Sequence, residues 1–221
     1  MTSRTAGEGS TPRLRADAAR NRAQVLAAAR TAFRELGTAA PLDEIARRAG
    51  VNIATLYRRF PDREALIQQV VLDGFTLVLQ AARDALDAAP QDPLAGIEGF
   101  LLRLVEERDT LVLPLIGGPV GTTPEAVEVQ SQIGPVLEDL LAHARTQGAI
   151  RPDVTPVDLI TTGALACRPL PYLPEEQATA LATRHVHIFV DGLRPDGTRP
   201  LTAPPTHEEL SAHVHAGPTQ S

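Results

Sequence analysis

The sequence contains no lysine and no tryptophan, and only one cysteine, Cys167, among its 221 residues. A single cysteine excludes an intrachain disulfide framework and fits a protein of a reducing compartment. Aromatic residues make up 3% of the chain and apolar residues 43%, a composition typical of a globular protein built from Ala-, Leu- and Val-rich helices. A biased genome explains the missing lysine better than selection for arginine does.

Long hydrophobic runs are also missing. The amino terminus has no apolar segment of the kind that a secretion signal needs, and the longest apolar candidate, residues 111–120, is interrupted by Pro114 and two glycines. We therefore expect a soluble, cytoplasmic protein. A P-loop, a GxSxG elbow, an HExxH motif and spaced CxxC pairs are absent from the sequence, and we expect neither a catalytic residue nor a cofactor.

Charge is divided unevenly along the chain. The net charge is −6, but residues 1–63 hold twelve arginines against six acidic residues, whereas residues 64–221 hold nine against twenty-one. Only the amino-terminal third is therefore suited to a polyanionic partner such as nucleic acid.

Two short helices around a tight turn are predicted at residues 41–63. Apolar side chains recur through the first helix at the spacing of one helical face, at Leu42, Ile45, Ala46 and Ala49. The charged residues between them fall on the opposite face. This helix therefore has one side that packs inward and one that meets solvent.

A turn and a second helix follow at once. Gly50 stands where helices commonly end in a left-handed residue, and the side chain of Asn52 can cap a new helix by accepting a hydrogen bond from a backbone N–H two or three residues later. Leu56 and Phe60, four residues apart, can pack inward. The side chains left facing outward are Ile53, Ala54, Thr55, Tyr57, Arg58 and Arg59. A helix-turn-helix of this kind can place its second helix in the major groove of DNA.

A family pattern runs through this stretch. Within the motif it consists of Ile45, Ala46, Ala49, Gly50, Val51, Thr55, Leu56, Tyr57, Phe60, Arg63 and Leu66. Upstream it consists of Arg22, Val25, Leu26, Ala28, Ala29, Phe33 and Gly37. Over roughly residues 20–70, this joint pattern resembles the DNA-binding segment of the TetR family of bacterial transcriptional regulators. The resemblance implies an all-α protein with a three-helix amino-terminal DNA-binding domain and a larger helical domain that binds a ligand and dimerises.

The DNA-binding residues that the resemblance implies are Asn52, Ile53, Ala54, Thr55, Tyr57, Arg58, Arg59 and Arg63. We expect Tyr57 to donate its hydroxyl to a phosphate, and Thr55 to do the same or to touch a base. Ile53 and Ala54 could meet thymine methyl groups. Relatives often carry a polar or basic residue where this chain has Ile53, so the operator sequence cannot be transferred from them.

The basic residues of the motif have two kinds of expected partner. Arg58 or Arg59 could contact guanine or phosphate, although relatives often carry histidine where this chain has Arg59. Arg63 lies in the first turn of the next helix, where its guanidinium and the free N–H groups could hold one phosphate together; the alternative is an ion pair with Asp62 or another nearby acid. At Pro41 many relatives have a threonine or serine that caps the helix and donates to phosphate, and proline cannot donate.

Apolar stripes and breaks define the expected domain order. Asp17 could cap the first helix, and later helices are predicted at residues 63–88, 93–108, 124–147, 156–167 and 174–193. The expected domains are a flexible basic arm at residues 1–15, a helix-turn-helix DNA-binding domain at 16–62, a helical effector-binding and dimerisation domain at 63–193, and a disordered C-terminal tail at 194–221.

The resemblance also implies what the larger domain does. In similar proteins it binds a small molecule between helices, and its last two helices pair with a second subunit; both of these helices are apolar over more than one face here. Such a homodimer reads a palindrome with two recognition helices one turn of DNA, or a multiple, apart. Candidate ligand-binding residues are Phe75, Leu79, Leu102, Leu111, Leu115, Leu140, His143 and Leu165. For each apolar residue of this set, plain core is the commoner role, and a histidine on an otherwise apolar helix, such as His143, is more often structural than ligand-binding.

The predicted function is a repressor that a small-molecule effector releases from a pseudo-palindromic operator. One alternative is a metal- or redox-responsive regulator on the same fold, in which Arg168 would stabilise the thiolate of Cys167 or the histidines beyond residue 205 would bind a metal. His185 and His187 fall on opposite sides of a helix, which is a poor arrangement for one metal ion. The remaining alternative is a helical ligand-binding protein or enzyme that ignores DNA.

Overall fold

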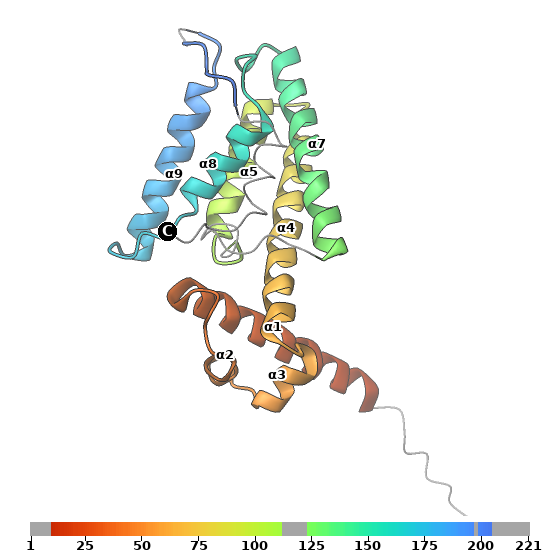
Figure 1. The fold of residues 1–221 in the computed structure, drawn as a ribbon. Helices are drawn as coiled ribbons and strands as arrows, with labels where there is room; N and C mark the ends of the chain where they lie inside the picture. Colours follow the sequence, from red (N-terminus) through yellow and green to blue (C-terminus); the bar gives the residue numbers. More distant parts are fainter. Residues whose placement is uncertain (1–9, 112–122, 197–198, 205–221) are drawn as a thin grey trace, which may run out of the picture. The chain divides into compact units, whose positions relative to one another are not determined.

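The computed structural model describes residues 10–111, 123–196 and 199–204 (Figure 1). All regular secondary structure in these residues is helical, which confirms the predicted fold class. The helices are α1 (Ser10–Leu36), α2 (Leu42–Arg48), α3 (Ile53–Arg59), α4 (Arg63–Ala88), α5 (Pro93–Glu106), α7 (Pro124–Thr146), α8 (Pro156–Ala166) and α9 (Glu175–Gly192). The chain divides into two compact units, Met1–Val70 and Val71–Ser221, and the division falls within α4.

The first unit contains α1, α2, α3 and the first turns of α4. Helix α1 packs against α2, and α2 packs against α3. Its buried core includes Val25, Leu26, Ala29, Phe33, Ile45, Leu56, Leu66 and Ile67. Gly37 after α1 and Gly50 after α2 have φ angles of +75° and +65°, a conformation that glycine adopts without a Cβ clash. The predicted ends of both helices are thereby confirmed.

Helix α1 begins earlier than the sequence indicates. The prediction of a start at Asp17, preceded by a flexible arm, is wrong for residues 10–15, because the helix runs from Ser10. Pro12 lies in the first turn, where a backbone N–H has no helical partner and proline is tolerated. The basic arm that the sequence predicts at residues 1–9 lies outside the described residues.

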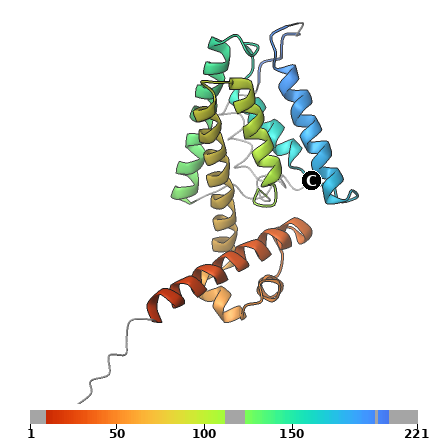
Figure 2. The same ribbon diagram turned by 180° about the vertical axis from the view of Figure 1, so that it is seen from behind.

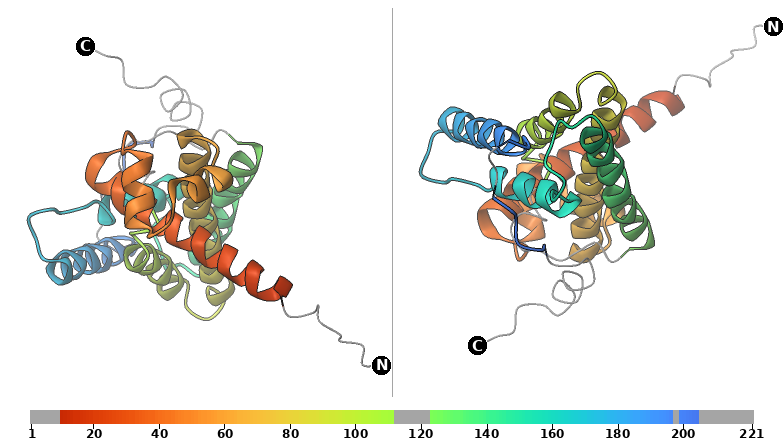
Figure 3. Two further views of the ribbon diagram at one scale, coloured as in Figure 1. Left: turned by 90° about the horizontal axis from the view of Figure 1, so that it is seen from below. Right: turned by 90° about the horizontal axis from the view of Figure 1, so that it is seen from above.

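The second unit is organised around α5. This helix packs against α7, α8 and α9, and α8 also contacts α7 and α9 (Figures 1 and 2). Helices α7 and α9 lie on opposite sides of the unit (Figure 3). The largest fully buried side chains are Ile97, Phe100, Leu101, Leu137, Leu140, Leu141 and Leu159. The outer surface of α9 is therefore free of covering helices from its own described unit.

Helix α4 is the one described helix that is long and apolar enough to cross a membrane. The expectation that no segment has this length is wrong for α4. Half of its apolar window is buried, and Leu79 and Ala82 are 6% and 0% exposed in the core of the second unit. The apolar character of α4 is thus explained by packing within the protein.

The segment after α9 is anchored to the loop between α7 and α8. Arg151, which is 8% exposed, donates from Nε and Nη2 to the Asp153 carboxylate at 2.6 and 2.8 Å, and from Nη2 to the carbonyl of Arg199. The backbone N–H of Leu201 donates to Asp153 Oδ2 at 2.9 Å. These bonds hold the pKa of Asp153 well below its usual range, Arg151 contributing most. The predicted disorder after α9 is therefore wrong for residues 199–204.

Two glycines of α5 provide a matched test of its packing. A Cβ at Gly96 would lie 2.9 Å from the Ala85 carbonyl oxygen and 3.5 Å from Leu140 Cδ1, whereas a Cβ at Gly99 would meet nothing within 4 Å. We expect Gly96→Ala to destabilise the protein by about 1–2 kcal/mol, because overpacking outweighs the gain in helix propensity. Gly99→Ala should stabilise it by about 0.5–1 kcal/mol. Urea unfolding at one protein concentration measures both; equal shifts would show that the Gly96 contact is not tight.

Candidate nucleic-acid interface

The start of α3 is set by a side-chain cap. Asn52 Oδ1 accepts a hydrogen bond from the backbone N–H of Ala54 at 2.8 Å, which confirms the predicted cap. Leu56 and Phe60 are 0% and 5% exposed, so they hold the inner face of α3 in the core of the first unit. The rest of the short helix is left to face outward.

The outer face of α3 carries Ile53, Ala54, Thr55, Tyr57, Arg58 and Arg59, all exposed or partly exposed. Tyr57 is 49% exposed. Neither Arg58 nor Arg59 makes a hydrogen bond or an ion pair with any residue that the structure describes. Two guanidinium groups and a phenol are therefore exposed on this helix, and their hydrogen-bond donors are available to a partner.

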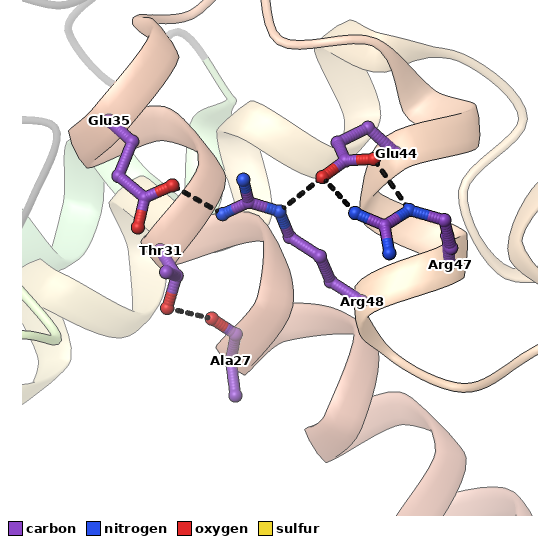
Figure 4. Close-up of polar contacts among 6 residues, drawn as sticks. All are labelled: Ala27, Thr31, Glu35, Glu44, Arg47 and Arg48. Carbon is purple, nitrogen blue, oxygen red and sulfur yellow. Dashed lines mark hydrogen bonds and ion pairs between the residues drawn. The ribbon is translucent and has the colours of Figure 1, made fainter.

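The arginines of α2 are used differently. Arg47 donates to both carboxylate oxygens of Glu44 at 2.7 and 2.8 Å. Arg48 donates to Glu44 at 2.7 Å and to Glu35 of α1 at 2.6 Å, so that it bridges the two acids (Figure 4). Hydrogen bonds from Arg47 and then Arg48 lower the pKa of Glu44 to about 2, and they raise the pKa of both arginines. The charge of α2 is thus compensated within the first unit, unlike that of α3.

Arg63, at the start of α4, reaches the loop between α1 and α2. Its Nη1 donates to the backbone carbonyls of Thr38 at 3.1 Å and Ala40 at 2.6 Å. Asp62 caps α4 by accepting from the backbone N–H of Ala65 at 2.7 Å. The sequence predicts a phosphate or an acid such as Asp62 as the partner of Arg63, and it carries no local signal for two carbonyls more than twenty residues upstream.

Comparison with known proteins identifies both parts of the chain. Residues 25–70 match the family of bacterial regulatory proteins, tetR family, and residues 92–195 match the transcriptional regulator SbtR-like C-terminal domain. The chain is 32% identical to a TetR transcription regulatory protein from Mycobacterium vanbaalenii, with 82% of this chain and 99% of that one covered and a TM-score of 0.55. The chain belongs to the TetR family.

Two further solved structures show how widely the fold of this TetR-family protein is shared. A TetR transcriptional regulator from Streptomyces coelicolor is 27% identical, covers 80% of this chain and 99% of its own, and has a TM-score of 0.50. A ketosteroid transcriptional regulator of Mycobacterium tuberculosis is 20% identical, with 86% of this chain and 99% of that one covered and a TM-score of 0.63. At this identity the similarity is one of fold alone. No curated protein sequence matches the chain. The family assignment makes this protein a DNA-binding transcriptional regulator.

Most of the ligand-binding residues predicted for this TetR-family chain lie in or against one core. The core cluster of the second unit contains Leu79, Leu111 and Leu140, and Phe75 and Leu102 pack against it while partly buried. Leu115 lies outside the described residues. Five of the eight predicted residues thus belong to or pack against the same core, and three of them are buried.

Two predicted ligand-binding residues face away from this core. Leu165 is 69% exposed on α8, and His143 is exposed on α7, with Nδ1 3.2 Å from the Asp139 carbonyl oxygen. Neither can line an interior pocket of its own subunit, because helical position turns both side chains to the surface. An open groove of about 550 Å³ lies elsewhere among the described residues and is lined by Asp92, Leu94, Ala95, Glu98, His187, Val190, Asp191 and Arg194. None of the predicted ligand-binding residues lines it.

Cys167 and the histidines among the described residues have ordinary structural surroundings, and the histidines beyond residue 205 lie outside the described residues. Cys167 is 2% exposed and its thiol donates to the Leu104 carbonyl at 3.2 Å. Burial raises the pKa of Cys167 to about 12, which leaves almost no reactive thiolate and disfavours oxidant sensing there. His187 Nε2 lies 3.2 Å from Glu98 Oε1, and His185 Nδ1 lies near a carbonyl of its own helix. No described residues form a group of three or more metal-ligating side chains.

Proposed function

We propose that the outer face of α3 reads operator DNA, and that the chain is a repressor acting in the cytoplasm as a binding protein and not as an enzyme. The observation that carries this proposal is the contrast between two pairs of arginines. Arg47 and Arg48 are held by Glu44 and Glu35, whereas Arg58 and Arg59 are exposed without a described partner. Free guanidinium groups on a recognition helix suit guanine edges and phosphates.

The other residues of α3 complete the proposed interface. Tyr57 would donate its hydroxyl to a phosphate, and Thr55 would contact a phosphate or a base. Ile53 and Ala54 would meet thymine methyl groups, since they are the apolar side chains at the start of the helix. The side-chain oxygen of Asn52 accepts the capping hydrogen bond, and its amide N–H groups would donate to DNA.

The proposed assembly is a homodimer formed by α8 and α9. Large apolar side chains are exposed on both helices: Ile160 and Leu165 on α8 and Leu181 and Ile188 on α9, with exposed fractions of 41%, 69%, 40% and 58%. A monomeric soluble protein rarely leaves such a set uncovered. A two-fold axis through this face gives a self-complementary contact and two α3 helices for a pseudo-palindromic operator.

An effector is proposed to act through the second unit. Phe75 and Leu102 are the predicted ligand-binding residues that are only partly buried, so a small apolar molecule could reach them with the least rearrangement of the core. An effector that lowers operator affinity about a hundredfold must bind the DNA-free conformation about 2.7 kcal/mol more favourably than the DNA-bound one. Its identity is left to experiment.

Genomic footprinting of the purified chain tests this function. We expect enrichment of fragments that share a pseudo-palindrome, and a plot of log affinity against log salt concentration with a steep negative slope. Regulated neighbouring genes would then suggest effectors for titration. If no DNA fragment is bound in a salt-dependent manner, the chain does not read DNA and the proposal is wrong. If operator affinity stays unchanged with every class of effector, the proposed control by an effector is wrong.

A further inference from the structure

Arg63 lies in a setting that differs from that of a surface phosphate ligand. It is the first residue of α4, it is partly buried, and its Nη1 contacts two backbone carbonyls of the 37–41 loop, which joins α1 to α2. Asp62, the acid beside it, is occupied as the cap of α4. The guanidinium therefore turns toward the loop of its own unit.

The 37–41 loop has few other means of keeping its shape. Gly37 ends α1 with a left-handed φ, and the backbone N–H of Ala40 donates to the Gly37 carbonyl at 3.1 Å. Pro41 caps α2 without any side-chain hydrogen bond, because proline carries no suitable group. No side chain within the loop supports the start of α2.

Arg63 supplies the missing support. Ala40 is 1% exposed, and a buried carbonyl needs a donor because water cannot reach it. Among the described residues, the carbonyls of Thr38 and Ala40 accept hydrogen bonds from Arg63 alone. One nitrogen that binds two carbonyls two residues apart fixes the curvature of the chain between them, and charge-assisted bonds of this kind are strong.

We infer that Arg63 is a positioning residue for DNA recognition, which staples the 37–41 loop to the start of α4 and so sets where α2 begins. Because α3 packs against α2, the staple also fixes the orientation of the recognition helix within the first unit. This inference rests on the proposed role of α3. A positioning residue and a phosphate ligand can be distinguished by experiment. Removing a phosphate ligand changes the salt dependence of DNA binding, and removing a positioning residue does not.

Arg63→Met tests the inference, with Arg59→Met as the matched control. Arg63→Met should lower operator affinity about tenfold at every salt concentration, with the log–log salt slope unchanged. Its Ala40 amide should exchange with solvent at least about tenfold faster in the free protein, because the loop opens more often. If Arg59 binds phosphate, Arg59→Met should make the plot of log affinity against log salt concentration less steep by about one. It should leave the exchange of the Ala40 amide unchanged.

Two results would contradict the inferred role of Arg63. If the plot of log affinity against log salt concentration becomes less steep by about one in Arg63→Met, Arg63 is a phosphate ligand. Unchanged Ala40 exchange would show that the loop does not depend on Arg63. If that variant does not fold, guanidinium NMR of the wild type decides: Arg63 signals that are the same with and without operator support the staple, and signals that move on binding refute it. Ala40 exchange needs no DNA, so it remains informative even if the wild type binds no operator.

Discussion

Replacing Leu165 and Ile188 with arginine should yield a folded monomer whose operator affinity is about 10²–10⁴-fold lower than that of the wild type. Both side chains are more than half exposed, one on α8 and one on α9, so the substitution leaves the core of the second unit intact. Four guanidinium groups would face each other across a two-fold axis in the dimer, and burying like charges is strongly unfavourable. Each monomer would then bind only one half-site, without the gain from a linked second site.

Sedimentation velocity measures the molecular mass of the double variant, and operator titration measures its affinity for DNA. Val127→Arg is the control, because Val127 is 51% exposed on α7, away from the proposed dimer face. It should leave the molecular mass and the affinity for DNA unchanged. A double variant that remains dimeric would show that the subunits associate through another surface.

Removing the two free arginines of α3 should also have a large effect. We expect Arg58→Ala combined with Arg59→Ala to lower operator affinity at least about thirtyfold, because each good arginine–guanine contact contributes about 1–3 kcal/mol. The fold should be unaffected, since neither side chain has a described partner to lose. Fluorescence anisotropy at several salt concentrations gives both the affinity and the salt slope.

Arg47→Ala is the matched control for this pair. Its guanidinium already binds Glu44, and Arg48 would continue to hold that acid. The expected change in affinity is therefore within about threefold, as for most exposed ion pairs. A loss as large as that of the double variant would mean that Arg47 leaves Glu44 for DNA. Single variants at the two α3 positions then separate base contacts, which relax sequence preference, from phosphate contacts, which weaken binding uniformly.

Local chemistry explains which features could be predicted. The turns at Gly37 and Gly50, the cap at Asn52 and the apolar stripes of α4, α5, α7, α8 and α9 each depend on residues within a few positions of one another. The early start of α1 does not follow from the sequence, because Asp17 offers a cap inside a segment that is already helical. The anchoring of residues 199–204 does not follow from the local sequence either, because Arg151 and Asp153, which hold this segment, are almost fifty residues away.

Sequence alone therefore determined the helical fold, the helix-turn-helix and the family, because these follow from short-range spacing and from residue types. Tertiary structure decided which charges are free. It showed that Glu44 occupies Arg47 and Arg48, that Arg63 turns to the loop carbonyls of Thr38 and Ala40, and that Leu165 faces solvent. The physical reason is that hydrogen bonds and burial depend on distances in space, and residues far apart along a chain acquire neighbours only when its helices pack.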